Sequence, residues 1–230
     1  MPAGGALAGD RQAFSNKVTE LIENDQNIEI IRKEATNLPH GKVIIATGPL
    51  TSDALAKEIA QLCGAESLYF YDAAAPIVSA ESIDMQNAFM AGRYDQDADY
   101  INCPMNEMEY AAFYAALIEG ETAELHEFEK HFEACMPIEK LAKRGYRTPL
   151  FGPMSPKGLL DNNGKRPFAV VQLRKENAEG SMYNLVGFQT NLKFGEQKRI
   201  FGMIPALKDA EYLRYGAMHR NTYIDSPRLL

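Results

Sequence analysis

Hydrophobic residues near the N-terminus recur at helical spacing and then give way to short, continuous apolar runs. Four of them lie on one face of a helix predicted to begin at Asp10: Phe14, Val18, Leu21 and Ile22. The runs 27–36, 42–48 and 67–73 are rich in β-branched or aromatic residues and predict strands, with 42–48 buried on both faces. Thr51 or Ser52 can cap a helix ahead of the third run. This order of elements predicts an α/β sheet.

The pattern changes after residue 74. Residues 74–105, rich in Ala, Asp, Pro and Tyr, predict irregular structure with one short helix. Residues 106–121 predict an amphipathic helix that continues helically over 123–133, and four residues are placed near its buried side: Met108, Ala112, Ala115 and Leu117. A short helix is expected at 137–145, with proline in its first turn and glycine at its end.

The last third of the chain predicts a second α/β or α+β layer. It contains the apolar segments 167–176 and 183–192 and a helix within 194–204. The shift in composition places a domain boundary near residue 74 and a return to the first domain near residue 210.

The composition fits a folded, water-soluble protein. The chain has 230 residues, 46% of them hydrophobic, and a net charge of -7, which argues against non-specific attraction to nucleic acid without excluding a local basic patch. Its apolar runs are too short to cross a membrane and no secretory signal opens it, so we expect a cytoplasmic location and no membrane partner. The oligomeric state is left open.

Three cysteines without a C-x-x-C pair suit a reducing compartment. Cys135 is followed by a proline that can begin a helix and by a cluster of cations, surroundings that lower the pKa of a thiol and make it nucleophilic. Cys103 is also followed by a proline and then a helix, so spacing does not choose between them, and a buried structural thiol is the alternative for both. Cys63, at the end of an amphipathic helix, is expected in the core.

Other polar residues suggest ligand contacts. No metal site is expected, because the four histidines are scattered and no H-E-x-x-H motif accompanies them. The apolar run 42–48 ends in Thr47 and Gly48, where a backbone can approach a ligand, although an ordinary turn reads the same way. The segments 140–147 and 213–221 combine cations with Tyr or His, as RNA-binding surfaces do, and solvated surface is the alternative.

Nine segments in one order carry a resemblance that runs through the whole chain. They are PAGGALAGDR, VIIATGPLTS, YFYDAAAPIV, YINCPMNEMEY, FEACMPIE, LFGPMSPKGL, YNLVGFQTNL, EQKRIF and MHRNTYI. Together they resemble the TrmFO family of folate- and flavin-dependent tRNA methyltransferases, which is related to the GidA/MnmG tRNA-modification proteins.

The resemblance implies an enzyme, a reaction and its cofactors. The family transfers a methylene group from 5,10-methylenetetrahydrofolate to carbon 5 of uridine-54 in the tRNA T-loop, and FAD and NAD(P)H complete the methyl group. Carbon 5 becomes nucleophilic once a thiolate adds at carbon 6, and the family cysteine in the matching segment implies that Cys135 is catalytic, with Cys103 as the alternative nucleophile.

The same resemblance implies binding residues. Thr47 and Gly48 match the strand end that approaches FAD, and three residues are placed by the flavin or the folate: Asn184, Gln189 and Thr190. Candidates for contact with tRNA are Lys143, Arg144, Arg147, His219 and Arg220.

The resemblance also implies a fold and its limits. We expect an α/β fold in which part of a Rossmann-like FAD-binding domain (1–74 and 211–230) flanks an inserted α+β substrate and tRNA domain (75–210). Family members begin with a strand and a G-x-G-x-x-G loop and end with a segment that closes over the flavin, and neither is found here, so we expect an internal fragment. The alternatives are a non-catalytic tRNA- or partner-binding fragment and a GidA/MnmG-like uridine modification.

Overall fold

The computed structural model describes the backbone of residues 2–3, 6–7, 9–64, 69–95, 98–123 and 136–222, without the side chains of 2–3, 6–7, 69–72, 95 and 218–222. Contacts divide the chain into two compact units. Unit 1 is formed by Met1–Asp10, Ala73–Leu125 and Glu133–Met218, and unit 2 by Arg11–Asp72, His126–Phe132 and His219–Leu230. The chain therefore changes unit at 10/11, 72/73, 125/126, 132/133 and 218/219.

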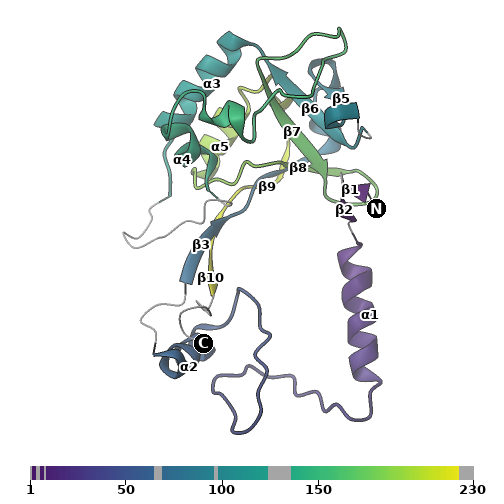
Figure 1. The fold of residues 1–230 in the computed structure, drawn as a ribbon, viewed down its shortest axis with the longest axis vertical. Helices are drawn as coiled ribbons and strands as arrows, with labels where there is room; N and C mark the ends of the chain where they lie inside the picture. The colour runs from purple at the N-terminus through teal and green to yellow at the C-terminus, as the bar shows by residue number, and fades with distance from the viewer. Residues whose placement is uncertain are drawn as a thin grey trace. The chain divides into compact units, whose positions relative to one another are not determined.

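Unit 1 is built on an antiparallel sheet whose strands run in the order β5-β6-β7-β8-β4-β9 (Figure 1). The strands are β4 (Ile77–Ser79), β5 (Phe89–Met90), β6 (Tyr100–Met105), β7 (Ala169–Lys175), β8 (Met182–Leu185) and β9 (Tyr212–Arg214). β6 and β7 pair over their whole common length, with Cys103 opposite Val171. β4 reaches the sheet from far along the chain and pairs with both β8 and β9. The fold is thus mixed α and β, and the prediction of an α+β domain is confirmed.

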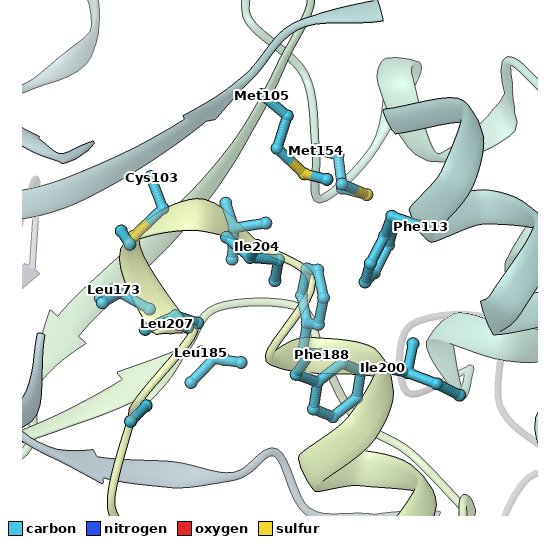
Figure 2. Packing of buried hydrophobic residues seen from close by; sticks show 14 of the residues in the cluster. Cys103, Met105, Phe113, Met154, Leu173, Leu185, Phe188, Ile200, Ile204 and Leu207 are labelled. Carbon is cyan, nitrogen blue, oxygen red and sulfur yellow. The ribbon is translucent and has the colours of Figure 1, made fainter. Parts of the chain in front are cut away.

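Helices and short 3-10 turns cover this sheet and enclose the main hydrophobic core, and Phe89, Leu159 and Val170 form a separate smaller cluster. The helices are α3 (Glu107–Glu119), α4 (Ile138–Lys143) and α5 (Phe194–Phe201), with 3-10 turns at η5 (Thr148–Phe151) and η6 (Pro205–Leu207). Phe188 shares this core with Phe113 of α3, their ring centroids 6.3 Å apart, and with Ile200 of α5 (Figure 2). The rings of Phe188 and Phe201 meet edge to face, with centroids 5.5 Å apart. Because each element supplies only part of this core, none of them can bury its apolar face alone.

Helix α3 begins as predicted but buries a different face. Asn106 caps it in a capping box, since its side chain accepts from the Glu109 N–H and the Glu109 carboxylate accepts from the Asn106 N–H. The buried residues are Tyr110, Phe113 and Leu117. The prediction is right for Leu117 and wrong for Met108, Ala112 and Ala115, which are exposed. The two rings bury far more apolar surface than methionine and alanine would, so they decide which face turns inward.

The prediction of irregular structure over 74–105 is wrong. This segment contains β4, β5 and β6 together with three short 3-10 turns, η1 (Ala80–Ser82), η2 (Met85–Asn87) and η3 (Arg93–Asp95). β6 even includes Pro104. These strands are two to six residues long. β4 and β6 are stabilised by partners more than sixty residues away and β5 by its pairing with β6, so no local period marks them in the sequence.

Unit 2 keeps its predicted helices but not all of its predicted strands. α1 (Arg11–Glu23) and α2 (Asp53–Cys63, N-cap Ser52) form as expected, and β3 (Tyr69–Ala73) pairs with β10 (Met218–Thr222). Residues 27–36 and 42–48 form no strand, and Ile44 is 94% exposed. A strand buried on both faces needs a neighbour on each side, and the described residues supply none for this segment.

Candidate functional site

The first turn of α4 is joined to residues 189–191 by three hydrogen bonds. The Ile138 N–H donates to the Gln189 carbonyl oxygen at 2.7 Å. The Glu139 carboxylate accepts from the Thr190 hydroxyl at 2.9 Å and from the Asn191 N–H at 2.8 Å. These bonds hold the segment that follows Met136 and Pro137 against the chain that leaves β8.

Glu139 is a buried acid without a cationic hydrogen-bond partner in the described part of the chain. Its exposed fraction is 1%, and its neighbours Ile138 and Ala142 lie in the core. Burial raises the pKa of Glu139 above its usual value, while the hydrogen bonds from Asn191 and Thr190 oppose that rise. No pattern in the sequence singles out this residue. Its local signal is an acid two residues after a helix-opening proline.

The Gln197 side chain of α5 joins Leu192 to Gly216, in the loop that follows β9. Its side-chain amide nitrogen donates to the carbonyl oxygens of Leu192 and Gly216, and its oxygen accepts from the Gly216 N–H, all within 2.8 Å. Gly216 has no room for a side chain, because a Cβ atom there would lie 2.5 Å from Thr190 Cγ2 and 2.7 Å from the Ala74 carbonyl oxygen. The loop after β9 is therefore fixed against the start of α5.

The residues predicted to lie by the flavin or folate occupy different environments in unit 1. Thr190 is fully buried, and its hydroxyl donates to Glu139 and accepts from the Leu192 N–H. Gln189 is half-buried, and its carbonyl oxygen accepts the hydrogen bond from the Ile138 N–H of α4. Asn184 is half-buried in β8, between Ile77 of β4 and Arg174 of β7. Gln189 and Thr190 thus lie on the α4 contact, and their role towards a cofactor stays a prediction.

The two candidate nucleophiles are not equally accessible. Cys135 lies outside the described residues. Cys103 has no exposed surface and lies in the core that also contains Leu173, Leu207 and Ile204 (Figure 2). Burial raises the pKa of the Cys103 thiol to about 12, so the nucleophilic thiolate form is strongly disfavoured there. This is a physical reason against Cys103 as nucleophile. Cys63, expected in the core, is half-exposed beside a small cluster that contains Leu55 and Ile59.

Thr47 and Gly48 belong to unit 2 and precede α2. Gly48 has a φ of 74°, and no atom lies within 4 Å of the position a Cβ would take. The Thr47 and Thr51 hydroxyls are 2.6 Å apart, and Thr51 also donates to the Gly48 carbonyl oxygen. The first turn of α2 carries an acid, Asp53, which disfavours an anionic pyrophosphate at that helix end. The role of Thr47 and Gly48 towards FAD stays a prediction.

The cations predicted to contact tRNA lie at the end of α4 and in the turn after it. Lys143, Arg144 and Arg147 are exposed. Tyr146 is held among them, because its ring packs edge to face against those of Tyr110 and Tyr114, with ring centroids 5.2 and 4.9 Å apart. Residues 140–160 contain five basic and no acidic residues, which makes this segment positive in an acidic chain. His219 and Arg220 lie on β10, where only the backbone is described.

Neither a membrane span nor a metal site is found in the described part of the chain. No helix there is both long enough and apolar enough to cross a bilayer. Nor do three or more His, Cys, Asp or Glu side chains gather there in a way that could hold a metal ion.

Comparison with known proteins assigns the chain to a family. The model of the family described as "Glucose inhibited division protein A" matches residues 1–230. The chain belongs to this family. It is also 59% identical over 234 residues to a protein of Listeria monocytogenes serotype 4b and 60% identical over 235 residues to one of Heliobacterium modesticaldum. Both are named methylenetetrahydrofolate--tRNA-(uracil-5-)-methyltransferase TrmFO. The matches confirm the resemblance read from the sequence.

The extent of these matches is uneven. Each covers 100% of this chain and 54% of the relative, so the chain spans about half the length of the curated relatives it matches. Among solved structures, GidA of Aquifex aeolicus superposes with a TM-score of 0.46 at 12% identity, covering 71% of this chain and 26% of that one.

Proposed function

We propose that the protein carrying this chain methylates carbon 5 of a tRNA uridine with 5,10-methylenetetrahydrofolate. The observation that supports this most strongly is the identity of 57 to 60% with proteins named for that reaction, over the whole chain. The finer proposal is that the target is uridine-54 of the T-loop, and that FAD and NAD(P)H supply the electrons that complete the methyl group.

Cys135 is proposed as the nucleophile of the reaction. Its thiolate would form a bond to carbon 6 of the uracil ring, and the electron pair of the C5–C6 double bond would make carbon 5 reactive towards the one-carbon unit. The anchored start of α4 supports this role, because Pro137 is buried and Ile138 and Glu139 are hydrogen-bonded to residues 189–191. The chain that follows Cys135 is thus held in one place.

The exposed cations after α4 are proposed to contact tRNA phosphates. Lys143, Arg144 and Arg147 belong to the segment without acidic residues, so the local field is positive although the net charge of the chain is -7. His219 and Arg220 complete the proposed contact set.

The test of this function is an assay with the full-length protein. It is incubated with an unmodified tRNA transcript, methylenetetrahydrofolate, FAD and NADPH or NADH, and 5-methyluridine is measured by mass spectrometry of the digested RNA. We expect methylation at one uridine, and Cys135→Ala should lower the rate by at least about a thousandfold because the covalent step is lost.

Two matched variants serve as controls for the thiol. Cys63→Ala and Cys103→Ala each remove a cysteine outside the proposed chemistry and should retain activity. If Cys135→Ala stays active while Cys103→Ala is folded and inactive, the assignment of the nucleophile is wrong. If the wild type forms no 5-methyluridine under any of these conditions, the proposed reaction is wrong.

A non-catalytic binding fragment is the second candidate for the chain by itself. It is supported by the open surroundings of Gly48 and the acid in the first turn of α2. The absorbance of the purified 230-residue chain separates the two. A flavin spectrum, or saturable binding of added FAD, would favour a cofactor site within the chain. If neither result is obtained, the non-catalytic binding role is favoured.

A further inference from the structure

Three aromatic rings form a continuous parallel stack at the junction of β9 and α5. The Tyr212 and Tyr215 rings are 5.1 Å apart with planes at 9°, and the Tyr215 and Phe194 rings are 5.0 Å apart at 15°. Tyr215 is therefore the middle ring and Phe194 is an end ring. Most aromatic pairs in the core of this chain meet at steep or tilted angles instead, such as Phe188 against Phe201 at 71°.

The stack runs from the protein interior to its surface. Tyr212 packs against the main core, whereas Phe194 is 58% exposed although it is a large apolar side chain in the first turn of α5. A flat ring that is stacked on one face and exposed in this way offers a further ring the same kind of contact that Tyr215 already makes.

The position of the stack is fixed by the surrounding backbone. Tyr215 directly precedes Gly216, whose N–H and carbonyl oxygen both bond the Gln197 side chain at 2.8 Å. Gln197 and Phe194 belong to the same helix, so one side chain ties the middle ring to the element that carries the end ring. A preformed platform of this kind loses little conformational entropy when a ligand binds.

The chemistry beside the stack favours an anionic ligand. Tyr212 lines a cavity of about 190 Å³ together with Lys198, Lys208 and Asp209. Neither lysine has an ion-pair partner among the described residues. The Tyr212 hydroxyl is the one buried side-chain polar atom without a hydrogen-bond partner in that part of the chain. Residues 193–214 carry five basic and three acidic residues, against a net charge of -7 for the whole chain.

We propose that this aromatic stack binds an unpaired nucleotide of RNA, with the base on Phe194 and the backbone phosphates of the strand near Lys198 and Lys208. Bases stack on aromatic side chains whatever their sequence, and cations next to such platforms neutralise the phosphates. The inference rests on the proposed function in that tRNA is the RNA considered. The aromatic stack is an RNA contact in addition to those already proposed for the cations after α4 and for His219 and Arg220 of β10.

The experiment measures the affinity of the full-length protein for an unmodified tRNA transcript and for a fully paired RNA duplex of similar length. Phe194→Leu keeps an apolar side chain but removes the ring, and we expect it to weaken tRNA binding by about 5- to 100-fold. Duplex binding should stay unchanged, because paired bases cannot stack on the ring. Phe194→Trp should restore tRNA affinity.

Leu213→Ala is the matched control, because Leu213 is an exposed apolar residue on the same strand as Tyr212. It should bind tRNA as the wild type does. Lys198→Gln combined with Lys208→Gln should weaken tRNA binding and lessen its dependence on salt. Circular dichroism verifies that each variant is folded.

The outcomes separate this inference from the proposed function. If the wild type binds tRNA and Phe194→Leu binds it equally well, the stack is not an RNA contact and the proposed function stands. If Phe194→Leu weakens tRNA and duplex equally, stacking on an unpaired base is wrong. If the wild type binds no RNA at all, the proposed function and this inference both fail.

Discussion

Single residues of one type behave differently in this protein according to their burial. Two of the cysteines show it, since Cys103 is enclosed by apolar side chains and Cys63 is half-exposed. Glu139 shows it for acids, because its carboxyl is buried away from water and this burial raises its pKa. The two hydrogen bonds that Glu139 accepts make it the residue that ties α4 to residues 190–191.

Removing the Glu139 side chain should destabilise unit 1. In Glu139→Ala the Thr190 hydroxyl and the Asn191 N–H remain buried without their acceptor, and we expect a loss of about 2–4 kcal/mol in the free energy of unfolding. Glu179→Gln, on an exposed loop, is the control and should change stability by less than about 0.5 kcal/mol. Denaturant titration measures both, and equal stability of the two variants would contradict the role given to Glu139.

The pH dependence of this site has a defined sign. The folded state binds the Glu139 proton more tightly than the unfolded chain does, because burial raises the folded pKa of this carboxyl above its usual value. The stability contributed by this proton is therefore complete below that value and is lost as pH rises through the folded pKa. Because glutamine does not titrate, wild type relative to Glu139→Gln should lose stability with rising pH, and the opposite slope would contradict the assignment.

Elements in unit 1 are determined partly by local signals and partly by what they pack against. Helix α3 begins where its capping box places it, whereas its buried face is chosen by Tyr110 and Phe113. Strands β4 and β5 have three and two residues and exist through their partners in the sheet. The same holds in reverse for 42–48, whose apolar sequence favours a strand that has no partner in the described part of the chain.

Loss of the α3 cap should have a moderate and local effect. Asn106→Ala removes the acceptor for the Glu109 N–H and breaks the reciprocal box, so we expect a loss of about 1 kcal/mol in the free energy of unfolding. Met108→Ala, on the exposed side of the same helix, should lie within about 0.5 kcal/mol of the wild type. Thermal or denaturant unfolding compares them. If the Met108 variant lost the more stability, the assignment of buried and exposed faces would be wrong.

The whole chain combines two units of unequal internal order. Unit 1 has a continuous core that involves every layer, whereas α1 in unit 2 buries none of its residues and the apolar side chains of 42–48 are exposed. None of the N–H groups from residue 34 to residue 50 donates to a backbone carbonyl of a described residue. Protection against unfolding should therefore differ between the units.

Hydrogen exchange on the 230-residue chain should show this difference directly. We expect amides of β6 and β7 to exchange orders of magnitude more slowly than those of residues 34–50, because the former are paired and buried and the latter are not. Exchange followed by mass spectrometry of peptides measures both regions in one experiment. Slow exchange at 42–48 would mean that this segment is paired as the sequence predicts.

The sequence by itself determined the features that depend on neighbouring residues and on long matching motifs. These are the helices α1, α2, α3 and α5, the proline-led start of α4, the strands β3, β7 and β8, and membership of the family. Caps, helical periods and apolar runs are local, so they can be read without knowing what lies opposite.

The tertiary structure decided what depends on residues far apart in the chain. It paired β6 with β7, turned Tyr110 and Phe113 inward, enclosed Cys103 in the core and left 42–48 without a partner. It also placed Thr190 against Glu139, and Tyr215 between Tyr212 and Phe194. Burial and pairing are the physical reason, because both are properties of the assembled fold and carry no fixed spacing in the sequence.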